Sequence, residues 1–216
     1  MKACSTDAGR GWPFMTLAET LHLHTATVPA RDELADLVQR AVDGDREAFD
    51  KVMIETQKRV MSVAWRMLGD EADARDAAQE TFLRVYKYLG RFDVTKDFNA
   101  WLYGITINAC RDLASKRKYH EPIEYEDEIY TNGSDAEQAS LQSQQREMIA
   151  RALRGLPEKE RAAVVLRDIE GMSTDEVAKV LKSTPTTVRS QISTARRKIK
   201  LYCDRHAGRY QTGGTR

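Results

Sequence analysis

The hydrophobic residues of the first half of the chain recur with a helical period. One stripe advances in steps of three and four and ends just before Gly69. Its members are Phe49, Val52, Met53, Thr56, Val60, Val63, Ala64, Met67 and Leu68. This spacing places them on one face of a helix. Gly69 is the predicted end of that helix, because glycine adopts the left-handed conformation that closes many helices.

Two further stripes follow at the same period. The second is Ala74, Ala77, Ala78, Thr81, Phe82, Val85, Tyr88 and Leu89, with Gly90 as its predicted end. The third is Phe98, Trp101, Leu102, Ile105 and Ala109, and Asp97 is suited to cap its first turn. The first half of the chain therefore predicts a small helical domain.

The period breaks in the acidic stretch 121–137, which contains Asn132-Gly133 and is a candidate linker. Helical spacing resumes near Leu141 and continues past Pro157, a residue suited to a first helical turn. No segment alternates apolar and polar residues as a strand does. The fold class predicted is all-α, with two small helical domains joined by a flexible acidic linker.

The end of the second half predicts a helix-turn-helix. Ser173 and Glu176 have the spacing of a capping box, and a short helix with Val177 and Ala178 inside follows. After the turn 182–185, a second helix places Val188, Ile192 and Ala195 inside and basic residues outside. A basic solvated helix in a bundle is the plain alternative. The cap, the small Ala178, the turn and the apolar pattern together favour DNA binding.

Composition narrows the class of protein. The chain has 216 residues, of which 41% are hydrophobic and 31% charged. Its longest apolar run is five residues, at 162–166, whereas a membrane span needs about 20. Three scattered cysteines argue against a disulfide scaffold and fit a reducing cytoplasm. Residues 1–30 and the tail after Cys203 lack a clear period and are predicted to be loose. Both Met1 and Met15 are candidate starts.

A net charge of +1 conceals strong local segregation. Residues 70–80 hold five acids and one base, and residues 121–137 hold seven acids and no base. Residues 111–118 hold four bases and one acid, and residues 182–200 hold six bases and no acid. Blocks of this kind predict different partners at different points of the chain.

Few residues suggest catalysis or cofactor binding. No nucleophile–base pair, phosphate-binding glycine loop or metal cluster is evident, so an enzyme is the least favoured class and no cofactor is expected. The pair His22 and His24 is a weak metal signal. Cys110 lies between apolar residues and is predicted to be a buried, inert thiol.

Two helices of the first half have alternative interpretations. The helix from Phe98 joins aromatic residues to a basic end, a combination that serves single-stranded nucleic acid through stacking and phosphate attraction. For Trp101 alone, a place in the core is the commoner explanation. The acidic face with Asp73, Asp76 and Glu80 is either solvated charge or a docking surface.

These residues resemble a known family, the bacterial sigma factors of the sigma-70 family. Residues 72–83 are similar to its polymerase-binding segment, and Phe98, Trp101, Asn108 and Asp112 match its promoter −10 segment. Leu156-Pro157 to Ala178 resembles the start of its −35-binding domain, and Thr187-Val188-Arg189-Ser190 the head of its recognition helix. Two domains without a middle one resemble the extracytoplasmic-function (ECF) group.

The resemblance implies a cytoplasmic transcription initiation factor with core RNA polymerase (β′ clamp and β flap), promoter DNA and an anti-sigma factor as partners. The implied polymerase-binding residues are Asp73, Asp76, Gln79, Glu80, Phe82 and Leu83. The implied −10 residues are Trp101, Asn108, Arg111, Asp112, Lys116, Arg117 and Lys118. The implied −35 residues are Thr187, Arg189, Ser190, Gln191, Thr194, Arg196 and Arg197.

The expected organisation is an arm at 1–30, a core-binding and −10 domain at 31–118, an acidic linker at 119–138, a −35 domain at 139–203 and a tail at 204–216. The sequence departs from the family at three places. Lys182 stands where glycine is usual in the turn, and Gln191 and Thr194 stand where many members have arginine. A left-handed non-glycine residue costs about 1 kcal/mol.

Two rival functions remain open at this stage. A helix-turn-helix regulator acting without polymerase predicts tight DNA binding by the free chain. A helical adaptor that binds only protein predicts no salt-dependent DNA binding. The acidic segment 72–83 beside the aromatic helix favours the sigma interpretation over the regulator.

Overall fold

The computed structural model describes residues 31–120 and 147–210, and every regular element in these ranges is helical. The first half contains α2 (Arg31–Val42), α3 (Arg46–Leu68), α4 (Glu71–Tyr88), the short 3₁₀ turn η1 (Leu89–Arg91) and α5 (Phe98–His120). The second half contains a helix over 147–154, then α7 (Glu158–Val164), the π-helical turn η2 (Val165–Ile169), α8 (Thr174–Val180) and α9 (Pro185–Tyr210). The all-α prediction is confirmed.

Helix α3 begins and ends where its sequence predicts. The Asp45 side chain accepts a hydrogen bond from the Ala48 amide, which satisfies one of the free donors of the first turn. Gly69 closes the helix with φ of 77°, and its amide donates to the Trp65 carbonyl. The predicted stripe forms the buried face.

Helix α4 differs from its prediction at its end. Gly90 does not stop it; the helix passes at Leu89 into η1, and Gly90 keeps a negative φ. Tyr88, predicted to be inside, is exposed. The period of three and four reaches Val85 correctly, but at the change to the tighter 3₁₀ turn Tyr88 lies outside the core while Leu89 is buried as predicted.

Helix α5 starts at the cap that was predicted, because Asp97 accepts from the Ala100 amide at 2.8 Å. Its first turns pack on α2, α3 and η1 in one of two hydrophobic clusters. Phe92, Phe98 and Trp101 meet there with ring centroids 4.9–5.7 Å apart. This cluster lies wholly within the first half.

In the second half, the predicted capping box is present. The Glu176 amide donates to Ser173 Oγ at 3.2 Å, and the Ser173 amide donates to Glu176 Oε2 at 2.7 Å. Lys182 has φ of 49°, so the turn keeps the left-handed geometry without glycine. Pro157 lies just before the first residue of α7 rather than within its first turn.

The prediction of a loose tail after Cys203 is wrong for residues 204–210, because α9 continues to Tyr210. One reason is a contact between residues four apart on the same helix face. The rings of Tyr202 and His206 stack with centroids 4.1 Å apart, and His206 Nδ1 lies 2.8 Å from the Tyr202 carbonyl. The arm 1–30, most of the acidic linker and residues 211–216 lie outside the described residues.

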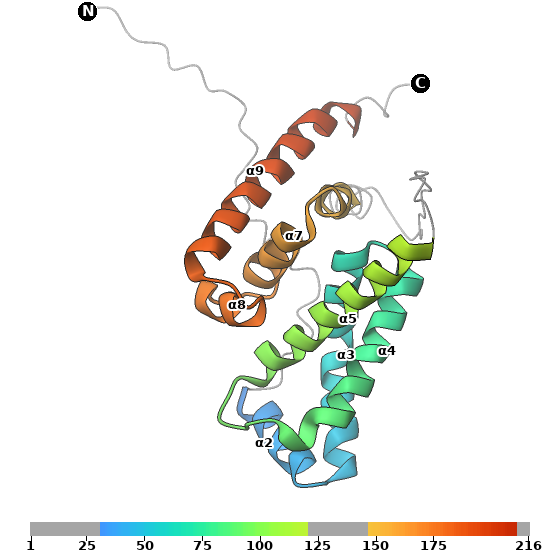
Figure 1. Cartoon of the computed structure of the whole chain (residues 1–216), viewed down its shortest axis with the longest axis vertical. Helices are drawn as coiled ribbons and strands as arrows, with labels where there is room; N and C mark the ends of the chain where they lie inside the picture. Colours follow the sequence, from blue (N-terminus) through green and yellow to red (C-terminus); the bar gives the residue numbers. More distant parts are fainter. Residues whose placement is uncertain (1–30, 121–146, 211–216) are drawn as a thin grey trace, which may run out of the picture.

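The two predicted domains are present, but they share one of the two hydrophobic clusters, whereas the sequence suggested a separate core for each. The larger hydrophobic cluster includes Val63 and Ile107 of the first half together with Leu153 and Val177 of the second. Helix α5 contacts α8, and α3 contacts α7 (Figure 1). The helices of the described residues include none that is long and apolar enough to span a membrane.

Candidate nucleic-acid interface

The predicted polymerase-binding residues lie along α4. Asp76, Gln79 and Leu83 are exposed, and Leu83 shows 58% of its surface to solvent. Asp73 and Glu80 are partly exposed in the acidic first half of the helix. Phe82 turns instead toward the core and packs on the cluster within the first half. An exposed leucine beside exposed acids suits a protein–protein contact.

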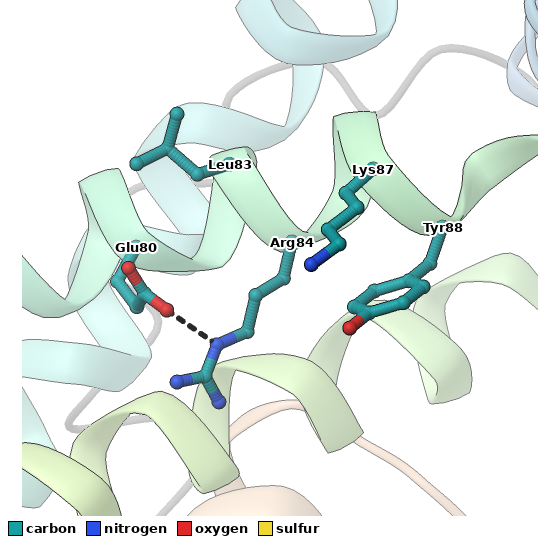
Figure 2. Close-up of a pocket in the computed structure, with 5 residues that line it drawn as sticks. All are labelled: Glu80, Leu83, Arg84, Lys87 and Tyr88. Carbon is teal, nitrogen blue, oxygen red and sulfur yellow. Dashed lines mark hydrogen bonds and ion pairs between the residues drawn. The ribbon is translucent and has the colours of Figure 1, made fainter.

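A surface pocket of about 360 Å³ lies on the same helix, lined by Glu80, Leu83, Arg84, Lys87 and Tyr88 (Figure 2). The Arg84 guanidinium donates to Glu80 at 2.7 Å and reaches Asp112 of α5 at 2.8 Å. These hydrogen bonds raise the pKa of Arg84 above its ordinary value. Arg84 thus joins a predicted polymerase-binding residue to a predicted −10 residue, which fixes α4 against α5.

The predicted −10 residues are distributed along α5 with different exposures. Trp101 lies partly exposed in the aromatic cluster, in keeping with the alternative of a packing role. Asn108 and Lys116 are exposed. Arg111 is ion-paired with Glu158 of α7. Arg117 and Lys118 continue the helix, and their side chains lie outside the described part.

The start of α9 is the most exposed part of the predicted −35 set. Thr184 Oγ1 accepts from the Thr187 amide at 3.2 Å and lies 2.8 Å from the Thr187 hydroxyl, which orders the first turn. Arg189 and Ser190 are exposed one turn further. Polar side chains at the start of a helix after a tight turn have the placement of a helix that enters a major groove.

Three of the four remaining −35 residues are less available for contact with DNA than predicted. The Oε1 atom of Gln191 is buried and has no hydrogen-bond partner among the described residues. Thr194 is partly buried, and Arg197 is exposed. Arg196 holds Asp168 of η2 through two hydrogen bonds of 2.6 and 2.8 Å, which raise the pKa of the arginine. Arg196 therefore has a structural role within the second half.

Sequence reasoning missed the polar contacts that join the halves. The Tyr103 hydroxyl donates to Glu170 Oε2 at 2.7 Å, and Arg66 Nη1 lies 3.7 Å from Glu170 Oε1. Burial and the nearby carboxylate raise the pKa of Tyr103 far above its ordinary value, so the hydroxyl stays protonated. Burial also lowers the pKa of Arg66. The one signal in the sequence was an acid placed directly after a buried helical run.

The positions of the two acids Asp168 and Glu170 depend on the π-helical turn η2. The Glu170 amide donates to the Val165 carbonyl at 3.0 Å, which is a spacing of five residues. The extra residue in the turn allows Asp168 to reach α9 while Glu170 reaches α5. No group of three metal-ligating side chains occurs within residues 31–120 and 147–210; His22 and His24 lie outside them.

Comparison with known proteins assigns the two halves of the chain to two regions of one family. Residues 53–119 match the family model of sigma-70 region 2, and residues 146–199 match that of sigma-70 region 4. The chain is 33% identical to the RNA polymerase sigma-H factor of Pseudomonas aeruginosa, over 76% of this chain and 90% of that protein. It is 31% identical to the ECF RNA polymerase sigma-E factor of Escherichia coli K12, over 78% and 94%.

Solved structures show the same architecture. CnrH, solved in complex with the cytosolic domain of CnrY, aligns with a TM-score of 0.62 and 27% identity over 80% of this chain and 98% of that one. The sigma factor RpoE of Bartonella quintana, solved with the anti-sigma factor NepR, has the same fold at a TM-score of 0.60 and 20% identity, over 72% and 96%. The chain belongs to the sigma-70 family of RNA polymerase sigma factors, in its extracytoplasmic-function group.

Proposed function

We propose that the chain binds core RNA polymerase and directs it to promoters that carry a −10 and a −35 element. The observation that carries this proposal is the presence of two exposed surfaces on one chain. One is the acidic and apolar face of α4, within the region 2 match, and the other is the polar start of α9, within the region 4 match.

Helix α4 is the proposed docking surface for the β′ clamp. The carboxylates of Asp73, Asp76 and Glu80 and the amide of Gln79 meet basic or polar groups there, while Leu83 supplies apolar area. Phe82 supports the surface from below, because it packs on the core. The second half then meets the β flap, as the family resemblance implies.

Helix α5 is the proposed −10 contact. Exposed Asn108 holds an unstacked base of the separated strand, and exposed Lys116 attracts phosphates together with Arg117 and Lys118. Arg111 and Asp112 have intramolecular partners in this structure, so their contribution to DNA binding requires those ion pairs to rearrange. Unstacking a base costs a few kcal/mol, which these contacts offset.

The start of α9 is the proposed −35 contact. Thr187, Arg189 and Ser190 recognise base edges in the major groove, with Gln191 and Thr194 at the margin, and Arg197 holds a phosphate. Neither DNA contact needs to be tight alone, because polymerase fixes both and raises their effective concentration. The role is non-catalytic and cytoplasmic, and an anti-sigma factor is the proposed regulator.

Binding to core RNA polymerase, followed by run-off transcription from a promoter library, tests this function. We expect stoichiometric binding and new promoter-specific transcripts. Leu83→Ala should weaken binding to core about tenfold, since each 1.4 kcal/mol is a factor of ten. Leu201→Ala is the matched control, because Leu201 is an exposed leucine of α9 outside the docking surface.

The alternative of a helix-turn-helix regulator acting without polymerase predicts the opposite pattern. It requires tight binding of the free chain to a duplex and no binding to core. That result would reject the sigma function. The exposed face of α4 favours the sigma function, because a free regulator has no use for it.

A further inference from the structure

The surface pocket on α4 contains two residues to which the proposed function gives no role, Lys87 and Tyr88. Its volume of about 360 Å³ is within the range of sites that hold small ligands, about 300–1,000 Å³. Figure 2 shows the side chains of Arg84 and Tyr88 on the same side of the helix. Glu80, Arg84 and Tyr88 are spaced four residues apart, so they form one row along α4.

This row faces α5, and Arg84 fixes its position there. The Arg84 guanidinium reaches Asp112 of α5 at 2.8 Å, and the two helices pack against each other and run antiparallel (Figure 1). Tyr88 lies one turn beyond Arg84 along α4. Asn108 lies one turn before Asp112 along α5, which is the same direction in space because the helices are antiparallel. Tyr88 and Asn108, both exposed, are therefore at the same height along the helix pair.

The Tyr88 ring has the surroundings of a stacking platform. It is 40% exposed, and Lys87 Nζ lies 5.4 Å from its centroid, within the range of a cation–π contact. Lys87 forms no ion pair within residues 31–120 and 147–210, whereas the Arg84 guanidinium is held by two carboxylates. The charge of Lys87 is therefore the one in this pocket that is available to a ligand.

An exposed aromatic ring beside an unpaired cation suits single-stranded DNA. Every base has a π face that stacks on such a ring, and the cation attracts a phosphate of the same strand. In a duplex, neighbouring base pairs already cover these faces, so the ring selects an unpaired base. A protein partner is less favoured, because Tyr88 belongs to the row that faces α5 and lies at the height of Asn108, the proposed contact for an unstacked base.

We propose that Tyr88 and Lys87 form a second contact for the separated DNA strand, in which the Tyr88 ring stacks on one unpaired base while Asn108 holds another. The Lys87 ammonium binds a phosphate of that strand. Arg84 is a positioning residue, because it ties the row to α5 through Asp112. This inference rests on the proposed −10 contact of α5, and it adds to that contact two residues from the helix that also carries the polymerase-binding face.

Photochemical cross-linking of the free chain tests the stacking contact, because the pocket is open in this structure. The probe is a random-sequence single strand of about 12 nucleotides in which 5-iododeoxyuridine replaces thymidine. We expect irradiation to give a cross-link that mass spectrometry maps to Tyr88. Tyr88→Ala should weaken binding of the probe at least fivefold. Tyr88→Phe keeps the ring and should bind within twofold of the parent chain.

Two control variants match these changes. Tyr86→Ala removes a tyrosine of the same helix that is 65% exposed and does not line the pocket, and it should leave binding of the probe unchanged. Lys87→Ala should lower the slope of the logarithm of affinity against the logarithm of salt concentration by about 0.7, the value for one phosphate contact on a single strand. Lys58→Ala, at an exposed lysine of α3, should leave the slope in place.

Binding of the same variants to core polymerase separates this inference from the proposed function. Tyr88→Ala should bind core as tightly as the parent chain. No binding of the probe by the parent chain, unchanged binding by Tyr88→Ala, or cross-links that avoid Tyr88 would overturn the stacking contact. Loss of core binding by Tyr88→Ala, with the single strand still bound, would assign the pocket to the polymerase instead. Failure of the parent chain to bind core would reject the proposed function, whatever the single-strand result.

Discussion

Asp168 and Arg196 form a two-pronged ion pair across the second half of the chain, with both guanidinium hydrogen bonds directed at one carboxylate. Asp168 is only 7% exposed, whereas Arg196 is 55% exposed. The pair fixes α9 against the π-helical turn, and Lys198 adds a second link to Glu160 of α7 at 2.9 Å. These contacts set the angle at which α9 leaves the domain.

Replacing Asp168 by asparagine should destabilise the protein. The change removes a charge-assisted hydrogen bond from a nearly buried site, and we expect the free energy of unfolding to fall by about 1–2 kcal/mol. Urea unfolding followed by circular dichroism measures it. Asp204→Asn, an exposed change on α9, should leave the midpoint in place. An unchanged midpoint for Asp168→Asn would show that the ion pair does not contribute to the free energy of unfolding.

Two neighbouring arginines should differ in their effect on DNA binding. Arg197 is exposed and has no ion pair among the described residues, so Arg197→Ala should lower the salt dependence of duplex binding by about one unit of slope. Arg196→Ala should change the slope by less and reduce stability, because Arg196 is held by Asp168. Salt titrations of binding to a labelled duplex give both slopes. Equal slopes for the two variants would contradict this assignment.

Lys182→Gly should stabilise the helix-turn-helix. Lys182 has a positive φ, a conformation that costs a residue with a Cβ about 1 kcal/mol and costs glycine almost nothing. The greater freedom of glycine in the unfolded chain offsets part of the gain, so we expect an increase below about 1 kcal/mol. Thermal unfolding should show a higher midpoint for Lys182→Gly and no rise for Lys182→Ala, which keeps the Cβ.

Cys110 should resist modification in the folded protein. Its side chain is 2% exposed, and burial raises the pKa of its thiol to about 12. The reactive thiolate is therefore scarce at pH 8, and the reaction should accelerate as the pH rises toward 12 or when urea unfolds the chain. In a Cys4→Ser, Cys203→Ser background, we expect Ellman's reagent to label Cys110 at least 100-fold faster in urea. Comparable rates in both conditions would show that the thiol is accessible.

The helices of this fold were predictable because their signals are local. The stripes of α3 and α5, the caps at Asp97 and Ser173 and the left-handed Lys182 depend on residues within one or two turns. The end of α4 was not predictable in this way, because the 3₁₀ turn at Leu89–Arg91 places Leu89 in the core and Tyr88 outside it. That choice depends on tertiary packing.

The candidate interfaces were predictable as segments but not as sets of free side chains. Leu83, Asn108 and Arg189 are exposed, as a binding role requires. Arg111 and Arg196 engage acids 47 and 28 residues away, and Phe82 packs inward. Partners at such separations follow from the packing of whole helices, which periodicity within one helix does not specify. The contact of Tyr103 with Glu170, 67 residues apart, was missed for the same reason.

The hydrophobic cluster shared by α3, α5 and the second half also determines how the free protein melts. Since Leu153 is packed in the same cluster as Val63 and Ile107, the loss of one half removes neighbours from the other. We therefore expect the two regions to melt together in one cooperative transition, although each matches a separate family model. The cavity left by Leu153→Ala would speed amide hydrogen exchange in α3 and α5, although both helices lie far from Leu153 in the sequence. In the free chain, two modules of sequence behave as one unit of stability.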